Sequence, residues 1–155
     1  NLFKELKKNK IDGLIIVDLP YVESEEFLKK LNEEGVDLIR LISPTTTDER
    51  ISKILASSSG YLYYISLKGV TGSNLKVSEE LEKRVSKIKK QTNLPVVVGF
   101  GIKDAETANK MSKCSDGVVV GSKLVDEISK HPSIEDNLLK QNLTSIIEDL
   151  KLGIS

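Results

Sequence analysis

The stretch PVVVGFGI at residues 95–102 passes directly from an apolar run into a glycine-rich turn. Consecutive valines are typical of a parallel strand buried on both faces, because a half-exposed strand alternates apolar and polar residues. Gly99 and Gly101 follow, and a residue without a Cβ lets backbone N–H groups approach a bound anion closely. The stretch therefore predicts a central parallel strand that ends in an anion-binding turn.

Four further segments have the same character, and Arg40 is the exception within their apolar positions. Amphipathic helical patterns lie between them, such as the apolar positions Val77, Leu81, Val85 and Ile88. Alternating strands and helices without a Pro-, Gly- or Ser-rich linker predict one α/β domain over residues 1–155, with a parallel sheet. The predicted strands are Leu14–Val17, Leu38–Ile42, Tyr61–Ile65, Val96–Phe100 and Gly117–Val120.

A parallel sheet forms either an open doubly wound fold or a closed barrel. The glycine-rich dinucleotide turn of open sheets is missing after the first predicted strand, where residues 17–20 read VDLP. Glycine turns come late instead, at Gly99–Gly101 and at Gly121 and Ser122, as in phosphate-binding (β/α)8 barrels. Because a whole barrel takes about 250 residues, the chain is expected to be the C-terminal part of one, about five βα units, lacking the first three strands.

Composition argues against several classes of function. The chain has 23 Lys and Arg against 23 Asp and Glu, whereas nucleic-acid binding needs clustered surplus cations. Its apolar runs are too short to span a bilayer, and no secretory signal is expected. One cysteine, Cys114, and one histidine, His131, do not provide the ligands of a structural zinc or iron–sulfur site, so no metal is expected. A lone cysteine favours a reducing compartment, and the expected location is cytoplasmic.

The carboxyl ends of the predicted strands carry groups that suit a phosphate ester. A bound phosphate needs converging backbone N–H groups without Cβ atoms in the way, together with a hydroxyl or a helix N-terminus. Gly72, Gly101, Gly121 and Ser122 supply these groups. The helix expected after Ser122 directs its positive end at the anion. We therefore predict a phosphate-binding site built from three loops.

Six motifs follow one another along nearly the whole chain. They are LIIVDLP at 14–20, SPTT at 43–46, GYLYYIS at 60–66, GVTG at 69–72, PVVVGFGI at 95–102 and DGVVVGS at 116–122. In this order they resemble the tryptophan synthase α subunit from its fourth strand to its end. The most specific pair is GVTG with GFGI.

The resemblance implies a TIM barrel of the ribulose-phosphate-binding type that acts in tryptophan biosynthesis. Enzymes of this family are lyases that split indole-3-glycerol phosphate into indole and glyceraldehyde 3-phosphate. The resemblance implies no cofactor in this chain, since pyridoxal phosphate belongs to the partner, the tryptophan synthase β subunit. The two subunits form a heterotetramer in which indole is channelled to the β subunit.

The resemblance also implies roles for single residues. Tyr63 matches a tyrosine that reaches into the active site, and Phe100 matches a residue packed beside the indole. The loop Lys68–Ser73 matches a mobile lid that closes over the substrate. Asp18 and Pro20 lie on the face that meets the β subunit. The full set of implied substrate-binding residues is Tyr63, Thr71, Gly72, Phe100, Gly101, Gly121 and Ser122.

The chain departs from the family in one respect that bears on catalysis. Carbon–carbon cleavage needs a general acid and a general base, and the family's glutamate and aspartate match positions upstream of Asn1. Asp18 is the only carboxylate at a predicted strand end, and it either has a functional role or caps the following helix. The chain alone is therefore expected to be inactive, with exposed sheet edges that make it associate or precipitate.

Two other interpretations remain open at this point. One is another phosphosugar-binding barrel enzyme, such as an isomerase, although such enzymes carry acid–base aspartates on opposing strands. The other is a non-catalytic module that binds a phosphate ester or regulates a partner, having kept the site and lost the acids.

Overall fold

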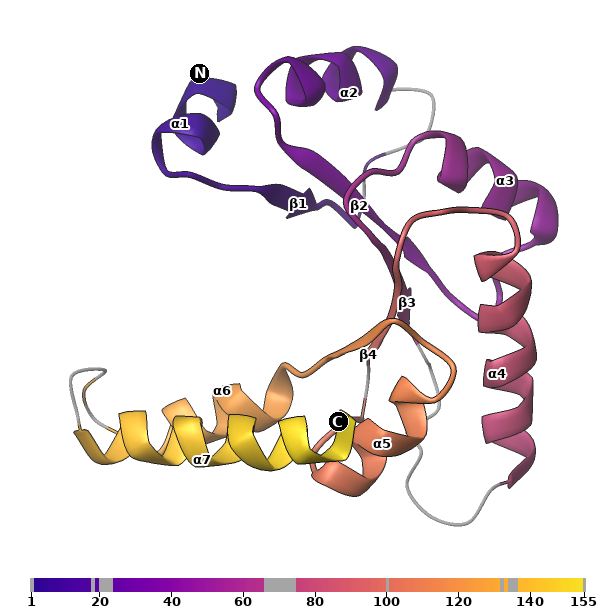
Figure 1. The fold of residues 1–155 in the computed structure, drawn as a ribbon. Coiled ribbons are helices and arrows are strands. Elements are labelled where there is room, and N and C mark those ends of the chain that lie inside the picture. The colour runs from indigo at the N-terminus through magenta and orange to yellow at the C-terminus, as the bar shows by residue number, and fades with distance from the viewer. Residues whose placement is uncertain are drawn as a thin grey trace.

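The computed structural model describes residues 2–17, 19, 24–65, 75–99, 101–131, 133 and 137–154 (Figure 1). Within these residues strands and helices alternate along the chain, as the sequence predicts. The strands are β1 (Gly13–Ile15), β2 (Asp37–Ile42), β3 (Leu62–Ile65), β4 (Val96–Gly99) and β5 (Gly117–Val119). The helices are α1 (Leu2–Lys8), α2 (Ser24–Glu33), α3 (Asp48–Ala56), α4 (Leu75–Lys89), α5 (Ala105–Ser112), α6 (Ser122–Ile128) and α7 (Asn137–Ile154).

The five strands form one parallel sheet whose order in space, β1-β2-β3-β4-β5, is their order in the sequence. Each strand pairs with the next one along the chain, whereas an open doubly wound sheet changes direction at a switch point. The helices lie around the outer, convex side, so the molecule is an arc that is open on its concave side (Figure 1). This arrangement is the one expected for part of a barrel.

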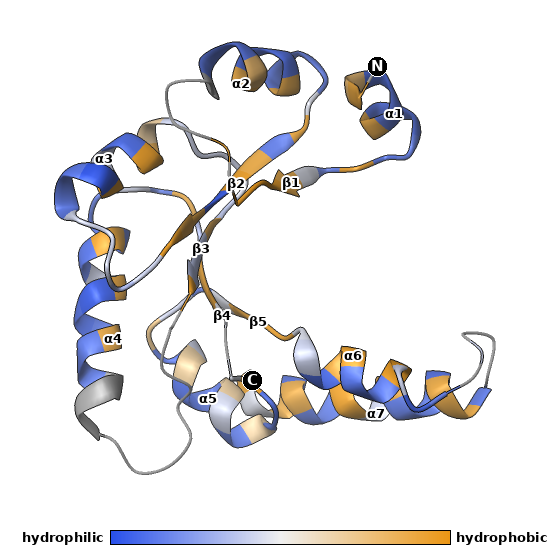
Figure 2. Ribbon diagram, turned by 180° about the vertical axis from the view of Figure 1, so that it is seen from behind, coloured by the Kyte–Doolittle hydropathy of each residue, from blue (hydrophilic) through white to orange (hydrophobic). Residues whose placement is uncertain are grey.

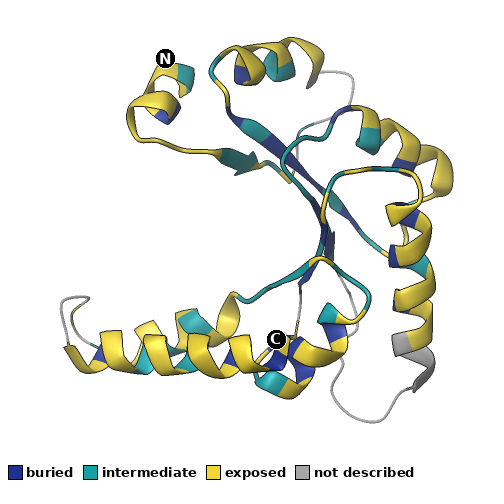
Figure 3. Ribbon diagram, in the orientation of Figure 1, coloured by how far each residue is buried: buried dark blue, intermediate teal, exposed yellow. Residues whose placement is uncertain are grey.

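The main hydrophobic core lies between the sheet and the convex-side helices. Leu62 and Val98 of β3 and β4 are fully buried against Val85 and Ile88 of α4. A second cluster joins Leu38 of β2 to residues of α1 and α2. Hydrophobic residues follow the strands (Figure 2), and much of β2, β3 and β4 is buried (Figure 3). In α6 and α7, by contrast, several hydrophobic residues are exposed, among them Val125, Leu138 and Leu152.

Two glycines make room on the concave side of the sheet. A Cβ on Gly99 would overlap the ring and hydroxyl of Tyr63, and a Cβ on Gly13 would lie 2.5 Å from Cδ1 of Ile39. Tyr63 and Ile39 alternate with the core residues of their strands, so their side chains lie on the side opposite the helices. In a closed barrel, side chains from this side fill the interior.

Asp116 links the amino ends of β4 and β5. Its carboxylate accepts a hydrogen bond from the backbone N–H of Val96 at 2.8 Å and one from Nζ of Lys89 at 2.5 Å. Lys89 first, and then the Val96 N–H, hold the pKa of this carboxyl below its usual range. Both strands are thereby fixed at their amino ends, and this sets the height at which their carboxyl ends present the next residues.

Four of the strands have boundaries that differ from those predicted. The first begins at Gly13 and ends at Ile15, two residues before Val17, and β2 begins at Asp37, one residue before Leu38. Tyr61 and Val120 lie just outside β3 and β5. Glycine is a weak strand former, so the sequence did not place Gly13 in a strand. Gly13 is accommodated in β1 because the absence of a Cβ leaves room for the side chain of Ile39.

Candidate functional site

The carboxyl ends of β3, β4 and β5 meet at one edge of the sheet. The register pairs Ile65 with Gly99 and Gly99 with Val119. Gly101 lies two residues after Gly99, and Gly121 lies two residues after Val119, the partner of Gly99 in the sheet. The two glycine turns that the sequence singled out thus lie side by side at the same height.

Gly101 and Gly121 are glycines for different reasons. Gly101 has a φ of +72°, a left-handed conformation that other residues adopt only with strain. Gly121 has a φ of −114°, and a Cβ there would meet no atom of the described residues within 4 Å. Neither its backbone conformation nor packing against the described residues requires a glycine at position 121. A bound anion needs open space beside the backbone, so binding of a ligand accounts for this glycine better than the requirements of the fold do.

Ser122 opens α6 directly after Gly121. Gly121 is the N-cap residue and supplies no side-chain hydrogen bond to the helix. The first N–H groups of a helix have no intrahelical acceptor, and the helix dipole makes this end positive. The start of α6 therefore combines a hydroxyl, backbone donors and a positive end beside the open space at Gly121.

Tyr63 stands next to these turns on the concave side, in contact with Gly99. Burial, and after it the nearby Tyr61, raises the pKa of the Tyr63 hydroxyl. The phenol therefore remains protonated at neutral pH and is available as a hydrogen-bond donor.

Five of the residues expected in the site or at the partner face lie outside the described residues. They are Asp18, Pro20, Thr71, Gly72 and Phe100, and the Lys68–Ser73 loop lies there too. The structure brings together Tyr63, Gly101, Gly121 and Ser122 around the ends of β3, β4 and β5. The remaining expectations stay predictions.

The structure adds a cleft that sequence reasoning missed. It has a volume of about 430 Å³ at the ends of β1, β2 and β3, and its lining includes Val17, Leu41, Ile65, Ser43, Thr45, Thr46 and Arg50. An adjoining cleft is lined in part by Arg40, whose Nη1 donates to the Leu19 carbonyl at 3.2 Å. The sequence signals were the SPTT motif and the charged exception at Arg40, but neither indicates a cleft without the three-dimensional arrangement.

Two other kinds of site were sought in the described part of the chain. No group of three or more His, Cys, Asp or Glu side chains there is placed to hold a metal ion. No helix in the same ranges is long and apolar enough to cross a membrane.

Comparison with known protein families identifies the family of this chain. Residues 1–153 match the family described as tryptophan synthase alpha chain. The chain belongs to this family. The resemblance to the tryptophan synthase α subunit is thereby confirmed.

Relatives from the tryptophan synthase alpha chain family share a large part of the sequence. The alpha chain of Marinobacter nauticus is 45% identical over 141 residues, which are 91% of this chain and 52% of the relative. That of Aromatoleum aromaticum is 38% identical over 148 residues, 96% of this chain and 54% of the relative. The chain thus spans about half the length of the curated relatives it matches.

Solved structures agree with these relatives. The tryptophan synthase alpha chain of Legionella pneumophila superposes with a TM-score of 0.80 at 33% identity, over 98% of this chain and 55% of that one. An aminoacrylate-bound tryptophan synthase from Mycobacterium tuberculosis gives 0.80 at 26% identity, over 99% and 55%. The prediction of an α/β chain built as part of a TIM barrel is confirmed.

Proposed function

We propose that this chain is the phosphate-binding part of a tryptophan synthase α subunit, a lyase that cleaves indole-3-glycerol phosphate into indole and glyceraldehyde 3-phosphate. Family membership supports the reaction class, the role in tryptophan biosynthesis and the β subunit as partner. The observation that carries the proposal is the open space at Gly121, next to the Gly101 turn and the start of α6.

The phosphate is bound mainly by backbone groups in this proposal. N–H groups at Gly101, Gly121 and Gly72 and the hydroxyl of Ser122 donate to its oxygens, and the positive end of α6 balances part of its charge. Thr71 binds the substrate beside Gly72. Tyr63 and Phe100 border the indole. Asp18 and Pro20 lie on the surface that meets the β subunit.

The chemical step needs groups that these residues do not provide. A general acid must protonate the indole ring carbon as the carbon–carbon bond breaks, and a base must take the proton of the glycerol hydroxyl. We assign both to a glutamate and an aspartate in the three βα units that precede this part of the barrel in the family. Residues 1–155 then bind the substrate without turning it over. The expected location of the whole enzyme is the cytoplasm, with no cofactor in this subunit.

Calorimetric titration with the unreactive analogue indole-3-propanol phosphate tests the proposal, with inorganic phosphate as the competitor. Saturable binding that phosphate competes away is expected. Gly121→Asp is expected to abolish it, because the carboxylate occupies the open space and repels the anion. Asn137→Asp is the matched control, since it adds the same charge on the exposed first turn of α7.

Each alternative gives a different result. Binding of phosphosugars without an indole ring in preference to the analogue indicates another phosphosugar-binding enzyme. Full binding together with no indole formation, even after the preceding βα units are supplied, indicates a non-catalytic binding module. A folded chain that binds none of these ligands, or binds equally well with Gly121→Asp, overturns the proposed site.

A further inference from the structure

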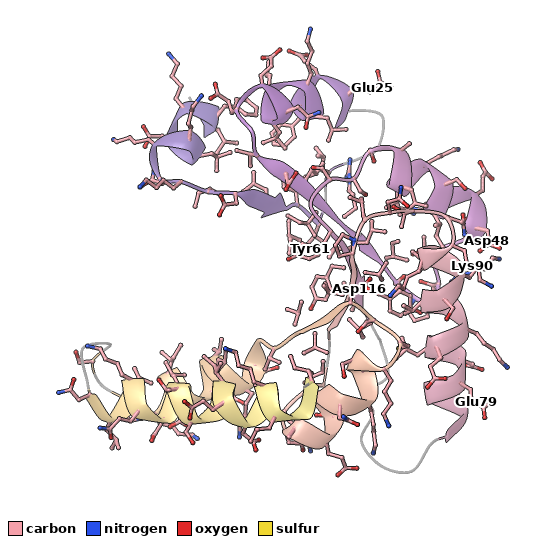
Figure 4. All side chains as sticks on the ribbon, in the orientation of Figure 1. Glu25, Asp48, Tyr61, Glu79, Lys90 and Asp116 are labelled. Atoms are coloured by element: carbon pink, nitrogen blue, oxygen red, sulfur yellow. The ribbon has the colours of Figure 1, made fainter. Side chains whose placement is uncertain are left out.

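A cation from α4 reaches across to the loop that follows β2. Nη1 of Arg84 lies 2.7 Å from Oδ1 of Asp48, the first residue of α3, and Nη2 donates to the carbonyl of Thr46. One turn further along α4, Nζ of Lys87 pairs with Oδ2 of the same aspartate. Figure 4 shows Asp48 on the side of α3 that faces α4. We call these four residues, Thr46, Asp48, Arg84 and Lys87, the Arg84 clamp.

Thr46, whose carbonyl accepts the hydrogen bond from Arg84, also takes part in a hydrogen-bond network of hydroxyl groups. Oγ1 of Thr46 accepts the backbone N–H of Ser43 at 3.0 Å and lies 3.1 Å from the hydroxyl of Ser43. That hydroxyl is 2.9 Å from Oγ1 of Thr45, and the Thr46 N–H donates to the Ser43 carbonyl at 3.0 Å. Ser43, Thr45 and Thr46 all line the cleft at the ends of β1, β2 and β3. The clamp therefore holds the loop that forms the polar wall of this cleft.

The two cations of the clamp contribute differently. Lys87 and Asp48 are 52% and 57% exposed, and ion pairs in such positions contribute little to stability. The Arg84 side chain is only 22% exposed, and its planar guanidinium binds a backbone carbonyl and a carboxylate at once. A lysine offers one point of charge and cannot reproduce this paired geometry. Arg84 is thus the member of the clamp that fixes the backbone of the loop.

We propose that Arg84 is a positioning residue: it fixes the Ser43–Thr47 loop and so orients the hydroxyl wall of the cleft. Its effect on ligand binding rests on the proposed function, in which the substrate binds at this edge of the sheet. Its effect on the loop itself does not. The sequence carries no sign of it, because Arg84 and Thr46 are separated by 38 residues.

Amide hydrogen exchange measured by NMR on the chain tests the loop directly. Arg84→Met is expected to accelerate exchange at the Ser43 and Thr46 amides by about tenfold, because both hydrogen bonds depend on a fixed loop. The buried amides of β4, at Val96 and Val98, keep their rates. Lys83→Met is the matched control, since Lys83 is exposed on the same helix and forms no ion pair within the described ranges.

A conservative variant distinguishes the effect of the guanidinium geometry from the effect of the positive charge alone. Arg84→Lys keeps the charge and replaces the methionine variant in the test if that variant does not fold. It is expected to leave exchange at Ser43 and Thr46 raised by about threefold or more. Wild-type rates at these amides in Arg84→Lys, or an equal rise at Val96 and Val98, overturn the proposal.

Ligand binding is the second measurement. Arg84→Met is expected to weaken binding of indole-3-propanol phosphate by about three- to tenfold, while Lys83→Met leaves the affinity unchanged. Unchanged affinity in a variant with a loosened loop overturns the link between this wall and the ligand. If the wild-type chain binds no analogue, the proposed function fails, and the exchange result still decides the role of Arg84.

Discussion

Gly99 shows how strongly one residue constrains the concave side of the sheet. Because a Cβ at this position would overlap the ring and hydroxyl of Tyr63, Gly99→Ala is expected to lower the free energy of unfolding by about 1–3 kcal/mol through overpacking. In a Tyr63→Ala background the same substitution is expected to cost much less, since the overlapping ring is gone. Urea unfolding of the two single variants and the double variant measures this coupling.

Gly117→Ala is the control for this residue-scale effect. A Cβ at Gly117 would lie 3.4 Å from Cγ1 of Val97, an ordinary contact on the same side of the sheet. Its cost is expected to be well below that of Gly99→Ala. Equal costs for Gly99→Ala with and without Tyr63 would show that the overlap is not what makes the glycine necessary.

At the scale of elements, Glu127 joins α6 to α7. Its carboxylate accepts hydrogen bonds from Nζ of Lys130 and Nδ2 of Asn142, each at 2.8 Å, and lies 3.4 Å from Nε2 of His131. Lys130 first, and Asn142 next, lower the pKa of this carboxyl to about 2. His131 thus belongs to the contact between these two helices.

This lowered pKa predicts a pH dependence with a definite sign. Since the carboxyl binds its proton more weakly in the folded state, its contribution is complete above pH 4.5 and is lost as the pH falls toward about 2. Glu127→Gln is expected to flatten that part of the stability profile, measured by urea unfolding at several pH values. Glu33→Gln, at an exposed position on α2, is expected to leave it unchanged. A profile that keeps its full slope in Glu127→Gln contradicts the assignment.

The contact between α5 and α7 depends on Gly153. A Cβ there would strike the backbone carbonyl of Ala105, and Nδ2 of Asn109 donates to the Gly153 carbonyl at 2.8 Å. Gly153→Ala is therefore expected to destabilise the chain by about 1–2 kcal/mol, although alanine is the better helix former. Ser145→Ala, exposed on α7, is expected to be neutral or slightly stabilising. Thermal unfolding followed by circular dichroism compares the two, and a stabilised Gly153→Ala rejects the close contact.

At the scale of the molecule, the arc leaves apolar surface at its open side. In the described sheet β1 and β5 are edge strands. Ile15, the last residue of β1, is 45% exposed, and Val17, two residues further on, is 73% exposed. Unpaired edges next to apolar side chains favour association. The isolated chain is expected to form dimers or larger species at micromolar concentrations in light scattering, and Ile15→Lys with Val17→Lys is expected to reduce them. A monodisperse monomer that unfolds cooperatively contradicts this expectation.

The sequence predicted the parts of the molecule that depend on local pattern. Runs such as Val96–Val98 predict parallel strands: Val96 and Val98 are fully buried against the helices, and Val97, on the open concave side, is half-buried. Gly101 and Gly121 follow β4 and β5 as the sequence predicts, and their role in binding phosphate stays a prediction. The contact between Tyr63 and Gly99 was not, although both residues belong to the quoted motifs, because it depends on the register of β3 against β4.

The unpredicted features join residues that are distant in the sequence. The Arg84 clamp and the cleft wall require α3, α4 and the loop after β2 to take up definite relative positions. No periodicity or motif within one element encodes such a contact. The roles expected for Thr71, Gly72, Phe100, Asp18 and Pro20 rest on the family resemblance and stay predictions.

The sequential order of the strands also bears on how the chain folds during synthesis. Each new strand adds to the edge left by the one before it, and no strand has to insert between two that have already paired. Contacts between strands therefore span only one βα unit, which keeps the loop-closure cost of each step low. As a nascent chain emerges from the ribosome, each βα unit can therefore pair with the strand before it without waiting for later parts of the sequence. The sheet can thus form strand by strand during translation.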